Sequence, residues 1–223
     1  MTPHRALLRD AVAVGLATGA YGLSFGAVAI AAGLSVAQTS ALSVLMFTGA
    51  SQFAFVASLG AGGAWAGAAT AALLGTRNAF YGLRLSSILP RAPARRLVGA
   101  HLVIDESTAM AVARDDPDEA RVAFWATGTA VFVCWNAATI IGAVGARALS
   151  NPRTLGLDAA APAAFVALLA PRVRSRPAAV LAGACMVVAL AATPVTPNGV
   201  PVLAAAGLVL VTAGVGARRR AEP

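Results

Sequence analysis

The sequence predicts an all-α integral membrane protein that forms a multi-helix bundle. Hydrophobic residues occupy 58% of its 223 positions and charged residues only 12%, whereas soluble domains carry roughly 25% charged residues. The apolar residues occur in runs of about twenty, long enough for a helix to cross ~30 Å of hydrocarbon. Alanine, glycine and valine dominate these runs, and such small residues let helices approach each other closely in lipid.

The positive charge fits a membrane protein better than a nucleic-acid-binding protein. The formal net charge is +8, and all 17 basic residues are arginines that lie mainly between or at the ends of the apolar runs. This distribution is typical of topology control in a lipid bilayer, so no nucleic-acid partner is predicted. Cys134 and Cys185 lie singly in apolar runs without the spacing of metal ligands. We expect them to pack between helices, and we predict neither a metal site nor a cofactor.

Eight apolar segments follow one another along the chain, and short connections rich in Gly, Pro and Arg join them. They are predicted to be the helices of a single transmembrane domain, residues 1–223. The segments are 11–33, 39–60, 64–88, 97–114, 122–147, 155–171, 178–194 and 199–217. Arg5 and Arg9 precede the first segment, as in a signal peptide, but that segment continues to Gly33 without a cleavage site. It is therefore predicted to be a retained helix.

The arginines also predict which segments cross the bilayer, because short cytoplasmic loops retain them. If all eight segments cross, the arginine group at 91–96 lies outside. Segments 39–60 and 155–171 could instead enter and leave the membrane on one side. Of the arginines that lie between segments, only Arg114 and Arg121 are then outside the cell. The prediction is therefore a topology of six crossings with a cytoplasmic N-terminus.

The two segments expected to re-enter share a short pattern. Residues 54–59 and 164–169 both contain Ala-Phe-Val-Ala followed by a leucine. One crossing, one broken or re-entrant segment and two further crossings would then make up each half of the chain. Each half then crosses the bilayer three times, so the second half begins on the opposite side of the membrane from the first. The half at 122–217 is therefore expected to be inverted relative to the half at 11–114. Such inverted repeats are typical of secondary transporters.

Polar residues interrupt segment 39–60 near its middle, where the sequence reads Thr-Gly-Ala-Ser-Gln from position 48. We expect the helix to break there, because a break exposes backbone N–H and C=O groups that can hold a charged solute. Gly49, Ser51 and Gln52 are therefore predicted to bind a solute. The alternative is that Ser51 and Gln52 only bond neighbouring helices.

Segment 155–171 contains the corresponding interruption in the second half. Asp158 and Pro162 are predicted to disrupt this helix and to contribute to the same binding site. The alternative for Asp158 is that it only begins a helix.

Segment 64–88 carries two cations on one helical face, Arg77 and, one heptad later, Arg84. A central arginine in a membrane helix costs about 2.5–3.5 kcal/mol on insertion scales, so it requires a polar cavity, an acidic partner or access to the surface. We expect Arg84 to reach the surface. Arg77, with Asn78 beside it, is predicted to bind a solute carboxylate or to pair with Asp158.

Segment 97–114 contains three titratable side chains, His101, Asp105 and Glu106. His101 and Asp105 are four residues apart, so in one continuous helix they share a face. Histidine is the side chain whose charge changes near neutral pH, and the group is therefore a predicted proton-coupling relay. The alternative is a helix that lies at the inner membrane surface, which would change the topology.

Several short patterns coincide with these interruptions. They are Tyr21-Gly22-Leu23-Ser24-Phe25-Gly26, Ala32-Gly33-Leu34-Ser35, Thr48-Gly49-Ala50-Ser51-Gln52-Phe53, Arg77-Asn78 with Tyr81-Gly82-Leu83, Ile104-Asp105-Glu106-Ser107, and Gly156-Leu157-Asp158 with Pro162-Ala163-Ala164-Phe165. In this order and spacing, over nearly the whole chain, they resemble the AzlC family, the large subunit of two-component branched-chain amino-acid exporters of bacterial cytoplasmic membranes. One departure is Gly75, where members commonly have asparagine.

The resemblance implies a membrane permease subunit that exports small apolar amino acids, with a small AzlD-like membrane subunit as partner. The sequence contains neither a P-loop nor a G-x-S-x-G elbow, so it predicts neither an ATPase nor a hydrolase, and transport would depend on a gradient or a partner. Two alternatives are a structural subunit of another transporter and a membrane-embedded enzyme that uses His101, Asp105 and Glu106.

Overall fold

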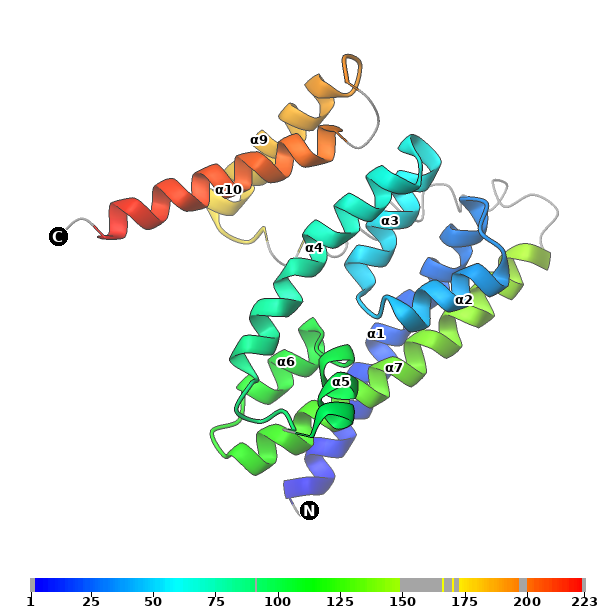
Figure 1. Cartoon of the computed structure of the whole chain (residues 1–223), viewed down its shortest axis with the longest axis vertical. Helices are drawn as coiled ribbons and strands as arrows, with labels where there is room; N and C mark the ends of the chain where they lie inside the picture. Colours follow the sequence, from blue (N-terminus) through cyan, green and yellow to red (C-terminus); the bar gives the residue numbers. More distant parts are fainter. Residues whose placement is uncertain are drawn as a thin grey trace.

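In the computed structural model, the described residues are 3–90, 92–148, 166, 170, 173–196 and 200–221, and their regular structure is entirely helical. Figure 1 shows the helices in the order α1 (Pro3–Ala31), α2 (Val36–Leu45), α3 (Gly49–Gly62), α4 (Ala64–Arg84), α5 (Pro93–His101), α6 (Asp105–Val112), α7 (Pro117–Ala148), α9 (Arg176–Ala192) and α10 (Val200–Ala221). The prediction of an all-α membrane protein is confirmed. Two stretches of these helices, Arg5–Ala31 and Pro117–Ala148, are long and apolar enough to cross a bilayer.

The long helices α1 and α7 pack closely along a row of glycines. The row lies on one face of α1 and consists of Gly15, Gly19, Gly22 and Gly26. A Cβ atom on Gly15 would lie 2.8 Å from the Cβ of Ala130, and one on Gly22 would lie 2.6 Å from the carbonyl oxygen of Trp135. Any side chain here would therefore push the helices apart. Successive glycines along α1 face residues that lie successively further along α7, so the two helices run parallel (Figure 1).

The predicted break in segment 39–60 is present, and it produces a helical hairpin. The capping box of Ser35 and Gln38 begins α2, and residues 46–48 separate α2 from α3. The two helices run in opposite directions, so both outer ends lie where α1 ends and α4 begins (Figure 1). We call α2 and α3, residues 36–62, the first hairpin.

Segment 97–114 differs from the prediction, because it forms two short helices instead of one. Residues 102–104 separate α5 from α6, and the buried hydroxyl of Ser107 stabilises this break. Its Oγ accepts a hydrogen bond from the backbone N–H of Ile104 at 3.1 Å and donates to the carbonyl of Leu102 at 2.6 Å. We call α5 and α6, residues 93–112, the second hairpin. His101 ends one helix and Asp105 begins the next, so they do not share a helical face.

The second hairpin also changes the predicted topology. Because it turns back instead of crossing, Arg95 and Arg121 lie at the same end of the molecule, where both line one groove. The six-crossing topology placed them on opposite sides. For the same reason α7 runs parallel to α1, whereas an inverted second half beginning at residue 122 requires the opposite direction. The parallel direction of α1 and α7 does not support the predicted inversion of 11–114 and 122–217. The inversion stays a prediction, because most of segment 155–171 lies outside the described residues.

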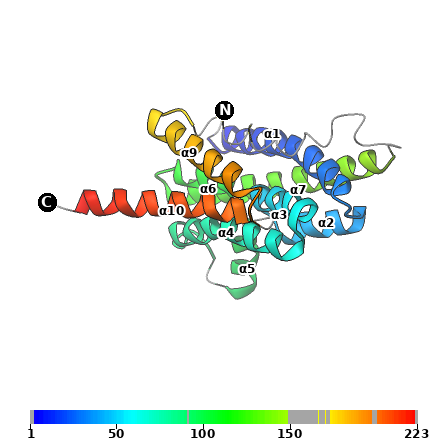
Figure 2. The ribbon, with the colours of Figure 1, turned by 90° about the horizontal axis from the view of Figure 1, so that it is seen from above.

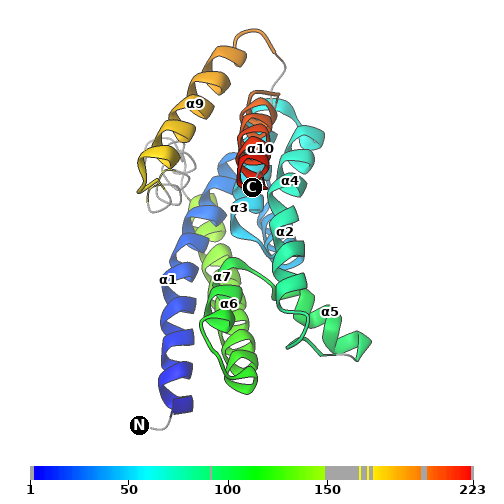
Figure 3. The same ribbon diagram turned by 90° about the vertical axis from the view of Figure 1, so that its left-hand side faces the viewer.

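The tips of the two hairpins meet against the middle of α7. The ring of Phe47, at the first tip, lies 5.8 Å from that of His101 at the second. Phe132 of α7 contacts both rings, at centroid distances of 5.0 Å to Phe47 and 5.8 Å to His101. Viewed from the side, α5 and α6 lie toward the end of the molecule that carries the N-terminus, and α3 lies toward the other end (Figure 3). The hairpins thus approach one another from opposite ends of the bundle.

The C-terminal part described consists of α9 and α10, which pack on each other (Figure 1). They correspond to the predicted segments 178–194 and 199–217. Asp158 and Pro162 lie outside the described residues, as does most of segment 155–171.

Candidate functional site

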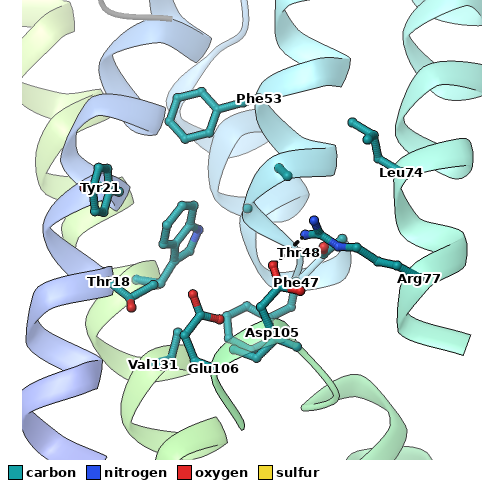
Figure 4. A pocket seen from close by; sticks show the side chains of 14 residues that line it. Thr18, Tyr21, Phe47, Thr48, Phe53, Leu74, Arg77, Asp105, Glu106 and Val131 are labelled. Atoms are coloured by element: carbon teal, nitrogen blue, oxygen red, sulfur yellow. Dashed lines mark ion pairs between the residues drawn. The ribbon is translucent and has the colours of Figure 1, made fainter. Parts of the chain in front are cut away.

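A cavity of about 320 Å³ lies where the two hairpins meet (Figure 4). Its walls come from α1, from the first residues of α3 and α6, and from the middle of α4 and α7. The volume is near the lower end of the range for small-molecule sites, about 300–1,000 Å³. The site is therefore large enough for a small solute, and breaks in two helices contribute to it.

An ion pair crosses one side of this cavity. Arg77 extends from α4, and its Nη2 lies 3.0 Å from Oδ2 of Asp105 at the start of α6 (Figure 4). Both side chains are partly exposed, at 30% and 26%. Glu106 lines the cavity beside Asp105. A guanidinium at this depth needs an anionic partner, and the structure supplies Asp105 in that role, whereas the predicted partner Asp158 is outside the described residues.

The N-terminus of α3 forms a second positive feature of the cavity. Gly49 and Ala50, the first residues of α3, line the cavity together with Thr48, which precedes them. The side chain of Thr48 makes no capping hydrogen bond. The first N–H groups of a helix have no acceptor within the helix and carry a partial positive charge. The cavity therefore combines this charge with the cation of Arg77.

The rest of the cavity wall is mostly apolar. The apolar side chains are Phe47, Phe53, Leu74, Ile104, Val131 and Trp135. Trp135 also covers Gly49, because a Cβ atom on this glycine would lie 2.9 Å from the indole ring. Thr18 and Tyr21 of α1 add two hydroxyl groups. An apolar wall with a few charged groups at one side is typical of a small-molecule site.

Gln52 lies behind the cavity wall rather than in it. Its side chain is fully buried, and its amide nitrogen donates to the carbonyls of Ser43, at 3.2 Å, and Met46, at 2.6 Å. Its oxygen accepts a hydrogen bond from Nε1 of Trp135 at 2.9 Å. These bonds join the end of α2, the turn at residues 46–48 and α7 around the helix break. The contacts favour the alternative in which Gln52 joins neighbouring segments.

The remaining predicted residues divide between the cavity and its surroundings. Ser51 is buried and does not line the cavity, and within the described residues its hydroxyl has no hydrogen-bond partner. Asn78 is half-buried beside Arg77, again outside the lining. His101 packs against Phe47 and Phe132. Of the proposed proton relay, Asp105 and Glu106 reach the cavity and His101 does not.

Thr18, Tyr21 and Trp135 are among the lining residues that were not predicted from the sequence. Tyr21 belongs to one of the short patterns that carry the family resemblance, so a signal was present. Trp135 lies in the middle of an apolar run, where a buried indole N–H needs an acceptor. The need for an acceptor indicates that Trp135 lies near a polar side chain, and Gln52 is that side chain.

Comparison with known proteins identifies the family. The family model described as AzlC protein matches residues 13–149, which is more than half of the chain and includes every residue that lines the cavity. No curated protein and no solved structure matches the chain. The chain therefore belongs to the AzlC family, a family of membrane proteins associated with transport.

Proposed function

We propose that the protein is a permease subunit that exports small apolar amino acids, including branched-chain ones, by secondary transport across a bacterial cytoplasmic membrane. The observation that carries this proposal is the composition of one cavity. It combines a cationic group, two carboxylates and an apolar wall within about 320 Å³. A free amino acid with an apolar side chain has the complementary set of groups.

The carboxylate of the amino acid would lie on the Arg77 side of the ion pair, and its ammonium group would lie on the Asp105 side. Its carboxylate would bind Arg77 and the N-terminus of α3, as anions do at broken helices in other transporters. Its ammonium group would bind Asp105 and Glu106, and its side chain would contact Phe53, Leu74 and Trp135. Arg77 and Asp105 bind each other at 3.0 Å, so each charge has a counter-ion.

The two hairpins supply the means to open the site alternately. Each enters from its own end of the bundle, and the cavity lies between their tips. Movement of one hairpin would admit solute from one side while the other stays closed, as in transporters whose sites lie at broken helices near the midplane. Asp105 and Glu106 are the proposed proton-coupling groups, with His101 behind them at the tip contact.

Two further assignments follow from the same proposal. The N-terminus lies at the same end as the arginines of α5 (Figure 1), and by the positive-inside rule this end is cytoplasmic. A small AzlD-like membrane subunit would complete the permease. Asp158 and Pro162 remain proposed ligands from the second half of the chain.

Transport in proteoliposomes tests the proposal. The purified chain, with and without a candidate small subunit, is assayed for counterflow of a panel of labelled amino acids. Arg77→Gln is expected to reduce leucine and valine counterflow at least tenfold, which corresponds to about 1.4 kcal/mol. Arg84→Gln is the matched control, since Arg84 lies one heptad later on α4, is exposed and does not line the cavity.

Equal counterflow in the wild-type protein and Arg77→Gln would reject the proposed site. Absence of counterflow for every amino acid, with the small subunit present and the protein correctly inserted, would reject the transport function and favour a structural subunit.

A further inference from the structure

The short helix α5 projects from the bundle and carries charged and apolar residues together. It lies at the periphery of the molecule in two perpendicular views (Figures 2 and 3). Arg95 and Arg96 are exposed on it, as are Leu97 and Val98, at 73% and 55%. An amphipathic helix with arginines and exposed aliphatic side chains is typical of a segment at the membrane–water interface. This position is separate from the cavity between the hairpins.

A groove of about 500 Å³ separates α5 from the beginning of α7. Its lining is Pro90, Ala94, Arg95, Val98, Arg121 and Trp125. Gly99 of α5 faces Leu89 and Trp125: a Cβ atom there would lie 3.1 Å from the side chain of Leu89, a tight contact, and 3.6 Å from the indole of Trp125, an ordinary van der Waals distance. The groove is therefore lined by four largely apolar side chains and two cations.

Arg121 is held in position within this groove. Its Nη1 lies 2.7 Å from Oδ1 of Asp118, and its Nε donates to the carbonyl of Ile88 at 3.4 Å. Asp118 is 87% exposed, and ion pairs at such exposure stabilise a protein only weakly. Asp118 therefore orients the guanidinium without cancelling its attraction for a second anion. Positioning of this kind lowers the entropy cost of binding.

We propose that this groove binds an anionic phospholipid. The phosphate would lie between the guanidinium groups of Arg95 and Arg121, which match a phosphate in charge and in geometry. One acyl chain would extend along Val98 and the ring of Trp125. Basic pockets at the cytoplasmic end of membrane helices bind anionic head groups in this way, and tryptophan favours the depth of the head groups. The bound lipid would connect α5, and with it the second hairpin, to the membrane surface.

Lipid binding to the full-length protein in detergent tests this inference. Native mass spectrometry measures the affinity for phosphatidylglycerol and for phosphatidylcholine, which differ in net charge. The wild-type protein is expected to retain phosphatidylglycerol preferentially. Arg95→Gln and Arg121→Gln are each expected to weaken its binding about fivefold, the factor for one basic side chain near an anionic surface. The double substitution is expected to abolish the preference.

Arg96→Gln is the matched control. Arg96 is exposed and lies on the same helix, one residue and about 100° around the axis from Arg95, and it does not line the groove. It is expected to change the affinity less than twofold. Circular dichroism and gel filtration of each variant separate a lost site from a misfolded protein, and Arg95→Lys is expected to retain part of the preference.

Three results would overturn the inference. They are equal affinity of the wild-type protein for the two lipids, an effect of Arg96→Gln as large as that of Arg95→Gln, and full displacement of the lipid by inorganic phosphate. The last result would identify a site for the free anion instead of a lipid.

Discussion

The ion pair between Arg77 and Asp105 determines the charge balance of the cavity. Its atoms are 3.0 Å apart, and both side chains are about one-quarter to one-third exposed. Loss of one partner leaves the other as an uncompensated charge, which costs more than loss of both. Single and double substitutions should therefore affect stability and transport differently.

We expect Asp105→Asn to lower the free energy of unfolding by about 1–3 kcal/mol, because the guanidinium of Arg77 loses its charged acceptor. The double variant Arg77→Gln/Asp105→Asn is expected to regain part of that stability but no transport. Thermal unfolding in detergent and counterflow in proteoliposomes give the two quantities. Asp118→Asn, which breaks the exposed pair with Arg121, serves as control and should change both little. A double variant whose loss of stability equals the sum of the losses in Arg77→Gln and in Asp105→Asn would show that the pair is not coupled.

Gln52 provides a second test at the level of residues. Gln52→Ala removes three hydrogen bonds and takes the side-chain partner from the carbonyl of Ser43 and from the indole N–H of Trp135, so a loss of about 2–3 kcal/mol in stability is expected. The carbonyl of Met46 keeps its bond from the N–H of Thr48. Gln52→Glu can still accept from Trp135 but cannot donate to Ser43 and Met46, so it should also be destabilised. A solute ligand would behave differently, with an unchanged unfolding midpoint and a raised KM. Measurement of the midpoint and the KM together distinguishes these roles.

Hydropathy alone was sufficient to find the charged half of the site. Arg77, Asp105 and Glu106 are visible in the sequence because each interrupts an apolar run, and the first residue of α3 is visible as a glycine among polar neighbours. Trp135 and Thr18 do not interrupt the apolar pattern of their segments. They belong to the site only because α1 and α7 pack where the hairpins meet. Gln52 shows a further limit. A polar side chain in a membrane segment needs partners, but the sequence does not state whether they are protein or solute.

Among the helices, the glycine row of α1 makes the most specific prediction. Gly22→Ala would place a Cβ atom 2.6 Å from the carbonyl oxygen of Trp135, so α1 must move away from α7 at a cost of about 1–3 kcal/mol. Gly145→Ala on α7 is the opposite case, since a Cβ there meets nothing within 4 Å. It should stabilise the protein by about 0.5–1 kcal/mol, because alanine favours helix. Thermal unfolding of both variants checks the two signs, and a shift in the same direction would contradict the packing.

The two helix breaks differ in how much the sequence reveals of them. Segment 39–60 carries its glycine and polar residues at the break itself, and the break was predicted there. The break in 97–114 falls on Leu102, Val103 and Ile104, which are all apolar, so hydropathy continues across it. Ser107, three residues further along, stabilises that break through contacts with backbone groups. Such contacts leave no trace in a hydropathy profile.

At the scale of the whole molecule, the topology depends on whether segment 97–114 is one crossing helix or a hairpin. A crossing at 97–114 places α1 and α7 in opposite directions and separates Arg95 from Arg121. A hairpin makes α1 and α7 parallel and brings these arginines to one groove. Composition and hydropathy therefore predict the class of fold, whereas the relation between its halves depends on one short segment that they do not resolve.

Cysteine labelling in intact cells tests the topology. In a background with Cys134→Ala and Cys185→Ala, Arg95→Cys and Arg121→Cys are expected to react from the same side of the membrane, the cytoplasmic one. Ala37→Cys, an exposed position at the start of α2, lies at the other end of the bundle and should react with an impermeant reagent from outside. Labelling of Arg95→Cys and Arg121→Cys from opposite sides would restore the six-crossing arrangement.

The meeting of two hairpin tips has an electrical consequence. If water fills the approach to each tip, the insulating layer between the two compartments shrinks from the ~30 Å of the bilayer to the septum formed by Phe47, His101 and Phe132. A transmembrane voltage then drops almost entirely across this septum. The electric field within the septum is therefore several times stronger than the field across a full bilayer. A charge displaced within this septum would cross a larger fraction of the voltage than the same displacement in lipid, and one elementary charge moved through the whole voltage is worth about 2.3 kcal/mol per 100 mV.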